Sequence, residues 1–210
     1  MANNKKVIII GAGLAGCEAS YQLLKRNYKV DLYEMRPLRS SPAHRTADFA
    51  ELVCSNSLKS DVPDTSSGLL KSELMSMDSL LIDCAYKTRV EAGGALAVDR
   101  EKFSDLVTEK IQANPYITVC RGEVREIPEG RVIVATGPLT SEALAGDIER
   151  RLGGGYLHFY DASAPIVSAD SVDMERAFFA SRYGRGSADY INCPMVKDEY
   201  DRFVDALISA

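Results

Sequence analysis

The most informative stretch of this sequence reads Lys6-Val7-Ile8-Ile9-Ile10-Gly11-Ala12-Gly13-Leu14-Ala15-Gly16. Its first five residues are mostly apolar and β-branched, which is typical of a short parallel strand buried on both faces. Apolar residues then recur at near-helical spacing as far as Leu24, and 30–34 reads as a second strand. A strand, a glycine turn, a helix and a strand in about thirty residues predict one βαβ unit.

The three glycines follow the pattern G-x-G-x-x-G, and each has a mechanical reason in such a unit. The first allows a tight turn, the second lets a diphosphate approach the backbone, and the third lets the helix lie close to the strand. The N–H groups at the helix start then receive phosphates. Glu34 ends the second strand, where its carboxylate can accept hydrogen bonds from an adenosine ribose. The predicted dinucleotide-binding residues are therefore Gly11, Ala12, Gly13, Leu14, Ala15, Gly16 and Glu34.

The motif alone does not separate NAD from FAD, because both cofactors use it. A carboxylate at Glu34 disfavours a 2′-phosphate, so NADP is not expected at this site. The stretch 132–137 favours FAD, because an apolar strand that ends in Ala-Thr-Gly is typical of flavoproteins with two dinucleotide sites. Gly137 is accordingly predicted to lie at the cofactor, although a core strand followed by a Gly-Pro turn fits the same residues.

Composition narrows the class of protein. The 210 residues are 46% hydrophobic and 26% charged, as in ordinary globular proteins, and the net charge of −5 excludes a broadly basic nucleic-acid binder. No apolar segment has the length of a membrane span or a signal peptide, so we expect a cytoplasmic protein. Five cysteines without metal-ligand spacing fit a reducing compartment and predict neither a disulfide framework nor a metal site.

Further along the chain, the sequence predicts a loop at 36–47 and an amphipathic helix over 67–85. Asp99 is expected to cap another helix. Its predicted buried face consists of Phe103, Leu106, Val107, the stem of Lys110, and Ile111. The residue pattern changes at Gly153, so we expect an α/β Rossmann-type domain at 1–150 and the start of a second domain at 151–210. A helix is expected over 197–208.

Several stretches together resemble one family. They are GAGLAGCEASYQL (11–23), YEMRP (33–37), FAELVCSNSLKS (49–60), AGGALAVDREKFS (92–104), VIVATGPLTS (132–141), FYDASAPIV (159–167) and NCPM (192–195). They are similar, in order and along almost the whole chain, to the folate- and FAD-dependent tRNA (uracil-5-)-methyltransferases. The related wobble-uridine modifying flavoproteins share the N-terminal motif but not FAELVCSNS. The resemblance implies a glutathione-reductase-like FAD domain followed by the start of an inserted α+β domain.

The resemblance also implies an activity. Members of this family take a one-carbon unit from 5,10-methylenetetrahydrofolate and place it on C5 of a T-loop uridine in tRNA, with FAD as cofactor and NAD(P)H as reductant. Cys54 would lie near the flavin and is the candidate catalytic residue, because a thiolate that adds to C6 of uracil activates C5. The other reading of Cys54 is a small buried hydrophobe. For Cys193, and for Cys17, Cys84 and Cys120, packing in the core is the expected role.

Two groups of basic residues are candidates for contact with RNA. Arg36, Arg39, His44 and Arg45 precede Cys54 with no acid among them, and they would either lower the pKa of its thiol, meet RNA phosphates or form a solvated loop. Tyr183 lies between Arg182 and Arg185 and could stack on a splayed base, although a surface loop explains the same residues. Members of the family continue beyond the length of this chain, so we expect an N-terminal portion whose own activity is in doubt. A flavin oxidoreductase without an RNA substrate and a non-catalytic flavin-binding fragment remain the alternatives.

Overall fold

The computed structural model describes residues 5–153, 167–181, 184 and 187–209. It divides the chain into two compact units, Met1–Val90 with Ala95–Ala164, and Glu91–Gly94 with Pro165–Ala210. Arg182, Tyr183 and Arg185, the predicted RNA-contacting residues, lie outside the described part of the chain, as does most of FYDASAPIV.

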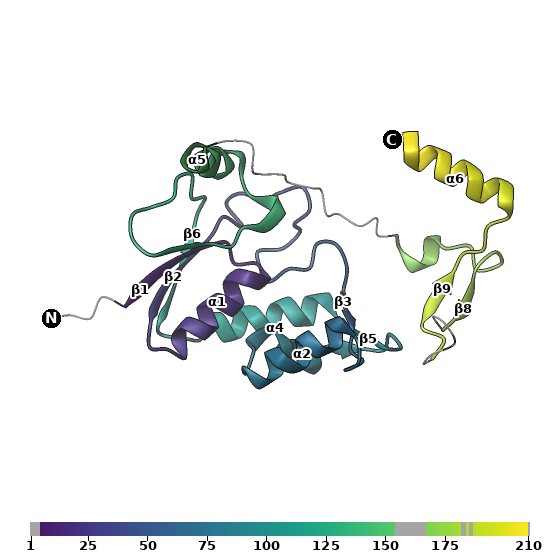
Figure 1. Ribbon diagram of the computed structural model, residues 1–210, viewed down its shortest axis with the longest axis horizontal. Helices are drawn as coiled ribbons and strands as arrows, with labels where there is room; N and C mark the ends of the chain where they lie inside the picture. Colours follow the sequence, from purple (N-terminus) through teal and green to yellow (C-terminus); the bar gives the residue numbers. More distant parts are fainter. Residues whose placement is uncertain (1–4, 154–166, 182–183, 185–186, 210) are drawn as a thin grey trace. The chain divides into compact units, whose positions relative to one another are not determined.

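The first unit is built on a parallel sheet of four strands in the order β6-β2-β1-β7 (Figure 1). These strands are β1 (Lys6–Ile10), β2 (Lys29–Glu34), β6 (Ile117–Arg121) and β7 (Val132–Val134). The register places Ile9 opposite Leu32 and also opposite Ile133, so the two N-terminal strands lie at the centre of the sheet. The predicted βαβ unit is confirmed, and the fold is α/β and Rossmann-type.

Helices lie on both sides of this sheet. In Figure 1, α1 (Leu14–Leu24) and α4 (Arg100–Gln112) lie below the strands, and α5 (Glu142–Leu152) lies above them. Asp99 caps α4 as predicted, because its side chain accepts a hydrogen bond from the Lys102 N–H. Three residues of the predicted apolar face of α4 are buried in the core: Phe103, Val107 and Ile111.

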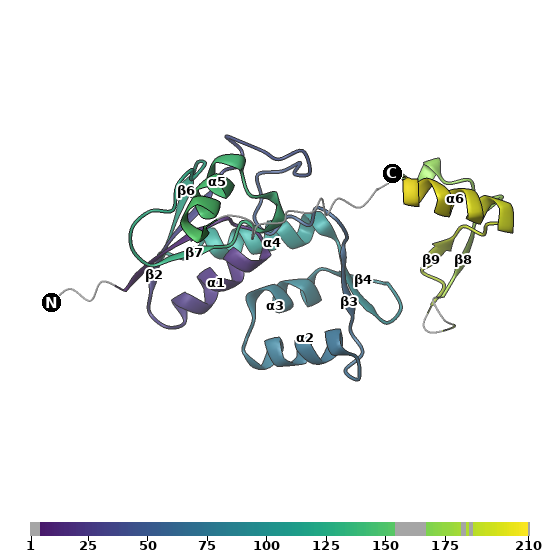
Figure 2. The same ribbon diagram turned by 45° about the horizontal axis from the view of Figure 1, so that its top comes forward.

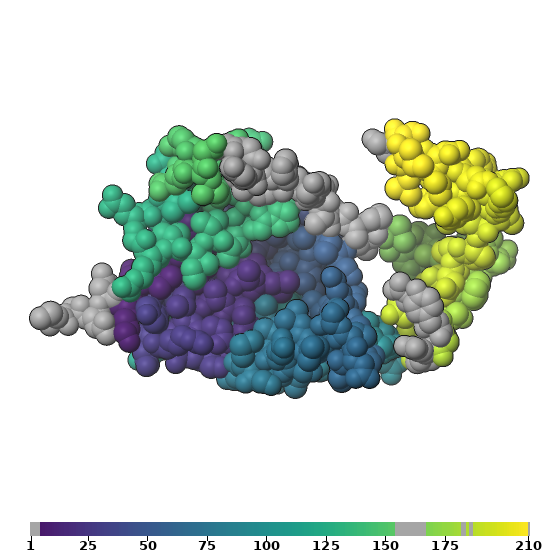
Figure 3. Space-filling model, in the orientation of Figure 1, coloured from purple at the N-terminus to yellow at the C-terminus, as the bar shows by residue number. Residues whose placement is uncertain are grey.

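The single helix predicted over 67–85 is wrong. The structure has two helices instead, α2 (Ser66–Ser76) and α3 (Leu80–Lys87), because Asp78 takes a left-handed conformation with φ of +55° and ends the first helix. Ser79 then caps α3 by accepting a hydrogen bond from the Ile82 N–H. The turn between the two helices lies beside the end of α1, and the space-filling view shows the two surfaces in contact (Figure 3).

Three further elements complete the first unit, and the sequence analysis did not predict them. An antiparallel sheet in the order β3-β5-β4 consists of β3 (Ser57–Ser60), β4 (Arg89–Val90) and β5 (Ala95–Val98), and Figure 2 shows it beside α2 and α3. A short 3-10 helix, η1 (Gly137–Leu139), follows β7. The third element is α5, which ends at Gly153 in a left-handed conformation.

The second unit contains the 3-10 helix η2 (Ala169–Ser171), a hairpin of β8 (Phe178–Ala180) and β9 (Tyr190–Asn192), and α6 (Lys197–Ser209). The helix predicted over 197–208 is confirmed. Its apolar residues Tyr200, Phe203, Leu207 and Ile208 are exposed. Cys193 is exposed as well, so its predicted place in the core is wrong. Among the described residues, no helix is long and apolar enough to cross a membrane.

Candidate functional site

The glycine turn between β1 and α1 shows the three separate roles that the motif predicts. Gly11 has a φ of +99°, and a Cβ added there would lie 2.8 Å from the carbonyl oxygen of Ala135. A Cβ on Gly16 would lie 1.8 Å from the carbonyl oxygen of Gly11, so the helix can approach the strand only because this residue is glycine. A Cβ on Gly13 would meet nothing within 4 Å. The open space therefore lies at the glycine that must face a diphosphate.

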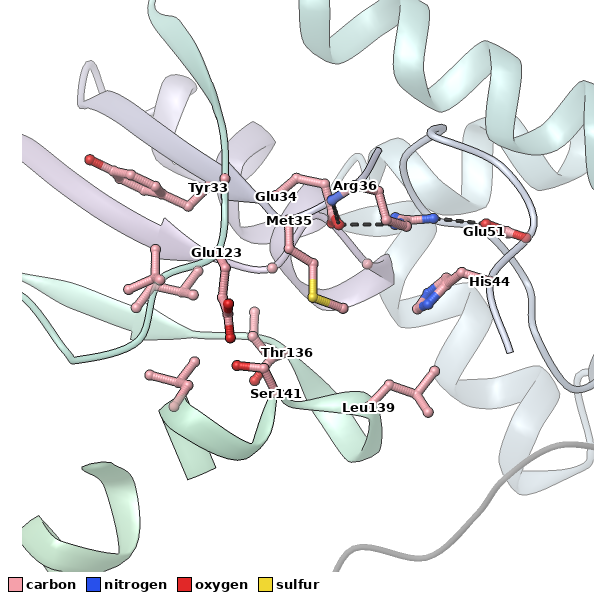
Figure 4. Close-up of a pocket in the computed structure, with 17 residues that line it drawn as sticks. Tyr33, Glu34, Met35, Arg36, His44, Glu51, Glu123, Thr136, Leu139 and Ser141 are labelled. Atoms are coloured by element: carbon pink, nitrogen blue, oxygen red, sulfur yellow. Dashed lines mark hydrogen bonds and ion pairs between the residues drawn. The ribbon is translucent and has the colours of Figure 1, made fainter. Parts of the chain in front are cut away.

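A pocket opens at this turn, at the carboxyl ends of the parallel strands (Figure 4). Gly11 and Gly13 line it, together with Glu34 from the end of β2, Glu123 after β6 and Thr136 after β7. Ligands of parallel α/β sheets bind at this edge, where the strand order reverses. The first N–H groups of α1 have no partner within the helix, so they and the positive end of the helix dipole are available to an anion.

Glu34 is a buried carboxylate whose two oxygens are already oriented by the chain. Its Oε2 accepts a hydrogen bond from the Ala12 N–H at 3.0 Å, and its Oε1 accepts from the backbone N–H and the Nε of Arg36 at 3.1 and 2.9 Å. Burial acts to raise the pKa of Glu34, but the hydrogen bonds and charge of Arg36 outweigh it and hold that pKa below its ordinary value. The carboxylate is therefore ionised at neutral pH and retains lone pairs for ligand hydroxyls.

Arg36 is only 1% exposed and joins two glutamates. Its Nε donates to Glu34, and its Nη1 donates to Oε2 of Glu51 at 2.8 Å, as the dashed lines in Figure 4 show. Arg39 pairs with Glu123. Arg36 is therefore engaged by acids that lie outside the 36–45 segment, which corrects the expectation of a solvated basic loop for this residue. Arg39 is exposed beside Glu123, as that expectation has it.

His44 lies at the pocket, and its Nδ1 is 2.8 Å from the hydroxyl oxygen of Ser41. Burial lowers the pKa of this imidazole, and the neighbouring charge of Arg36 adds to the effect. The ring is therefore neutral at pH 7 and leaves its second nitrogen for a ligand. His44 was expected only among basic residues, and Thr136 belongs to the stretch 132–137 that was expected near the cofactor. Glu123 was not expected at the site, and its position just after the end of β6 is the signal that could have identified it.

Gly137 has a φ of +61° and begins η1 directly after the pocket residue Thr136. It lines a neighbouring, mostly apolar hollow with Val134 and Ile148, rather than the pocket at Gly13. The structure thus brings Gly11, Gly13 and Glu34 together at one pocket and places Gly137 one residue beyond it.

The cysteines divide by burial. Cys17 and Cys84 are fully buried, and burial raises the pKa of their thiols to about 12 and about 11, so neither is a thiolate at neutral pH. Cys120 is half-buried on β6, and Cys54 is exposed in the loop before β3. The backbone carbonyl of Cys54 accepts a hydrogen bond from Arg100 at 3.4 Å. Among the described residues, no group of three acidic, histidine or cysteine side chains could hold a metal ion.

These residues fit a dinucleotide. The space before Gly13 admits a diphosphate, α1 directs its N–H groups toward that space, and Glu34 lines the same pocket as an ionised acceptor. Among the described residues that line the pocket, the one arginine is Arg36, and it is held by two glutamates rather than directed toward a 2′-phosphate. Fold and site together define a Rossmann-type dinucleotide-binding domain.

The chain belongs to the glucose inhibited division protein A (GIDA) family, whose family model matches residues 6–210. It is 58% identical over 207 residues to the methylenetetrahydrofolate–tRNA-(uracil-5-)-methyltransferase TrmFO of Syntrophomonas wolfei, covering 98% of this chain and 48% of that protein. It is 58% identical over 209 residues to TrmFO of Koribacter versatilis, covering 99% and 47%. The chain thus spans about half the length of the curated relatives that it matches, and the resemblance found in the sequence is confirmed.

A solved structure also resembles this chain, but only weakly. The crystal structure of CtdE in complex with FAD and substrate 4 matches with a TM-score of 0.38 and 15% sequence identity, over 63% of this chain and 38% of that one. A likeness at this level carries no argument about function.

Proposed function

We propose that this chain is the FAD-binding part of an enzyme that transfers a one-carbon unit from 5,10-methylenetetrahydrofolate to C5 of a T-loop uridine in tRNA. The observation that carries the cofactor assignment is the open space before Gly13 with Glu34 at the same pocket. The identity of 58% to TrmFO relatives supports the reaction and its substrates. FAD, when bound, supplies the redox chemistry of the transfer, and NAD(P)H is the proposed source of electrons.

The residues of the glycine turn have distinct roles in this proposal. The N–H groups of Gly13, Leu14 and Ala15 at the start of α1 hold the diphosphate, and Glu34 accepts hydrogen bonds from the ribose hydroxyls. Arg36 keeps the Glu34 carboxylate ionised and fixed in orientation. Gly137 approaches the cofactor from the turn after β7. An enzyme of this kind would work in the cytoplasm, where its tRNA substrate resides.

Cys54 is the proposed nucleophile. Its thiolate would form a bond to C6 of the uracil ring and push an electron pair toward C5, which attacks the one-carbon unit and displaces the nitrogen that carries it. Loss of the C5 proton would then expel the Cys54 thiolate, and two electrons from NAD(P)H would reduce the methylene to a methyl group. The exposure of Cys54 supports this role, because a large RNA substrate can reach an exposed thiol. Its neighbours Ser55 and Asn56 lie on the same loop, and Asn56 is anchored to β5 through the backbone of Val98.

The test uses the full-length protein that contains this chain, a T-loop tRNA transcript and tritium-labelled methylenetetrahydrofolate. The expected result is incorporation of tritium by the parent protein, loss of incorporation in Cys54→Ala with FAD still bound, and unchanged incorporation in Cys193→Ala. Cys193 is the matched control because it is also an exposed cysteine. Oxidation of NADPH that is indifferent to tRNA and folate, without incorporation, would instead identify a flavin oxidoreductase.

A further inference from the structure

A closed ring of hydrogen bonds and ion pairs begins and ends at Ala12 of the glycine turn. The Ala12 N–H donates to Glu34, Glu34 pairs with Arg36, and Arg36 pairs with Glu51. Ala50, next to Glu51, donates its N–H back to the carbonyl oxygen of Ala12 at 2.8 Å. We call these five residues the Ala12 ring. Both backbone polar groups of Ala12 are thereby used, one on each side of the ring.

The ring holds a segment that is remote in sequence from the glycine turn. Oε1 of Glu51 accepts from the Arg45 N–H at 2.9 Å, and Oε2 accepts from the N–H and hydroxyl of Thr46 at 3.2 and 3.0 Å. Ala50 takes a left-handed conformation with φ of +51°, which a residue without a special side chain adopts only where its surroundings impose it. Segment 45–51 is therefore fixed to the turn through Glu51 and Ala50, and Phe49 holds it to α4 through the Thr108 hydroxyl.

Cys54 lies between this ring and a second anchor. It is three residues beyond Glu51, and two residues later Asn56 is fixed to β5, where its side chain donates to the Val98 carbonyl and its own carbonyl accepts from the Val98 N–H. The exposed thiol therefore lies in a short loop between two anchors, and Arg100 also donates to the carbonyl oxygen of Cys54 at 3.4 Å.

We propose that the Ala12 ring couples occupancy of the dinucleotide site to the reactivity of Cys54, with Arg36 and Glu51 as positioning residues. This inference rests on the proposed binding of a dinucleotide at the glycine turn. A ligand that contacts Glu34 and the N–H groups of α1 stabilises the ring, because it adds a partner to Glu34 and holds the turn that carries Ala12. The closed ring then limits the excursions of the Cys54 loop by which the thiol meets small reagents.

The experiment measures the rate at which iodoacetamide alkylates Cys54, with and without ligand. Trypsin releases Cys54 in peptide 46–59 and Cys193 in peptide 186–197, so mass spectrometry follows both thiols in one sample. The ligands are FAD, and ADP, which supplies ribose and diphosphate but has no flavin ring to shield the thiol. Binding is measured separately by fluorescence for FAD and by calorimetry for ADP. Each variant is then alkylated at a ligand concentration that saturates it.

The expected result in the parent protein is alkylation of Cys54 slowed about threefold or more by either ligand, with Cys193 unchanged. In Glu51→Gln the ring loses one of the two charges that pair with Arg36 and opens between Arg36 and residue 51, so the protection by bound ligand disappears. The matched control is Asp83→Asn, which likewise removes an ion-paired carboxylate. Asp83 pairs with Lys87 and Lys110 and lies outside the ring. This variant should keep the full protection. Circular dichroism verifies that each variant is folded. If Glu51→Gln unfolds, Arg36→Lys replaces it, with the same loss of protection expected, because one ammonium nitrogen does not reproduce the separate Nε and Nη1 contacts to Glu34 and Glu51.

Each outcome bears on one of the two proposals. If FAD does not bind the parent protein, the proposed cofactor fails, and this inference fails with it. If FAD binds but the alkylation rate of Cys54 does not change, only this inference is overturned. It is equally overturned if Glu51→Gln, with ligand bound, protects Cys54 as well as the parent does, because the protection then does not depend on the Ala12 ring.

Discussion

Gly16 of α1 lies so close to Gly11 of the preceding turn that a Cβ on Gly16 would come within 1.8 Å of the Gly11 carbonyl oxygen. This approach brings the start of the helix against the end of the central strand. It places the first N–H groups of α1 at the pocket, and the candidate site depends on that placement. The glycine turn therefore has one position that serves packing and another, Gly13, that serves a ligand.

Substitutions at these two glycines should separate stability from binding. Gly16→Ala should destabilise the protein by about 3 kcal/mol or more, because the backbone of the turn cannot move away without breaking the β1–α1 contact. Gly13→Ala should change the stability by less than about 1 kcal/mol, since its Cβ enters open space. The same methyl group should weaken FAD binding about tenfold or more by occupying the path of the diphosphate.

Thermal unfolding and FAD titration, performed on both variants, check this pair of predictions. A Gly13→Ala protein that unfolds like Gly16→Ala would mean that the space at Gly13 is part of the core. Normal FAD affinity in a folded Gly13→Ala protein would place the diphosphate elsewhere.

The ion pair of Glu34 and Arg36 should appear in the pH dependence of stability. The pKa of Glu34 is lower in the folded protein than in the unfolded chain. Its stabilising contribution is therefore complete above the unfolded value of about 4.3 and is lost as the pH falls through the folded value. The difference in unfolding free energy between the parent and Glu34→Gln should be constant from about pH 8 to pH 6 and should shrink below about pH 4. A difference that stays constant through the acid range would show that Glu34 gains nothing from ionisation in the fold.

Ser79, which caps the start of α3, should contribute measurably to the free energy of unfolding. Its hydroxyl accepts from the Ile82 N–H and donates to Oε2 of Glu18 on α1. Ser79→Ala should lower the free energy of unfolding by about 1–2 kcal/mol, as the loss of a helix cap usually does. Ser72→Ala, within α2, should be neutral or slightly stabilising, because Ser72 bonds only to a carbonyl of its own helix. Urea denaturation of both variants makes the comparison, and equal losses would contradict the assigned role of the cap.

The local patterns predicted the central part of the first unit well. The strand-glycine-helix signature at 6–24 and the cap at Asp99 each determine a structure within a few neighbouring residues, and both are confirmed. The single helix predicted over 67–85 is wrong because the helical spacing of apolar residues continues across Asp78. The left-handed backbone of Asp78 ends the first helix without changing that spacing.

The candidate site was predictable only where it is local in sequence. Gly11, Gly13 and Glu34 lie within one βαβ unit, and the motif brought them together. Arg36 was expected among loose basic residues, yet it is buried, since one of its two partners, Glu51, lies fifteen residues away and comes near only when the loop folds back. Contacts of this kind depend on the path of a loop, and no spacing rule describes that path.

The most direct measurement is a titration of isotope-labelled protein with FAD, in which the amide resonances of Gly13, Leu14 and Ala15 are followed by nuclear magnetic resonance. The account predicts saturable binding with the largest shifts at these three residues and at the adjoining residues of the glycine turn, and smaller shifts near Glu34. Saturable binding that leaves the turn unshifted, or a folded full-length protein that binds no FAD, would contradict it.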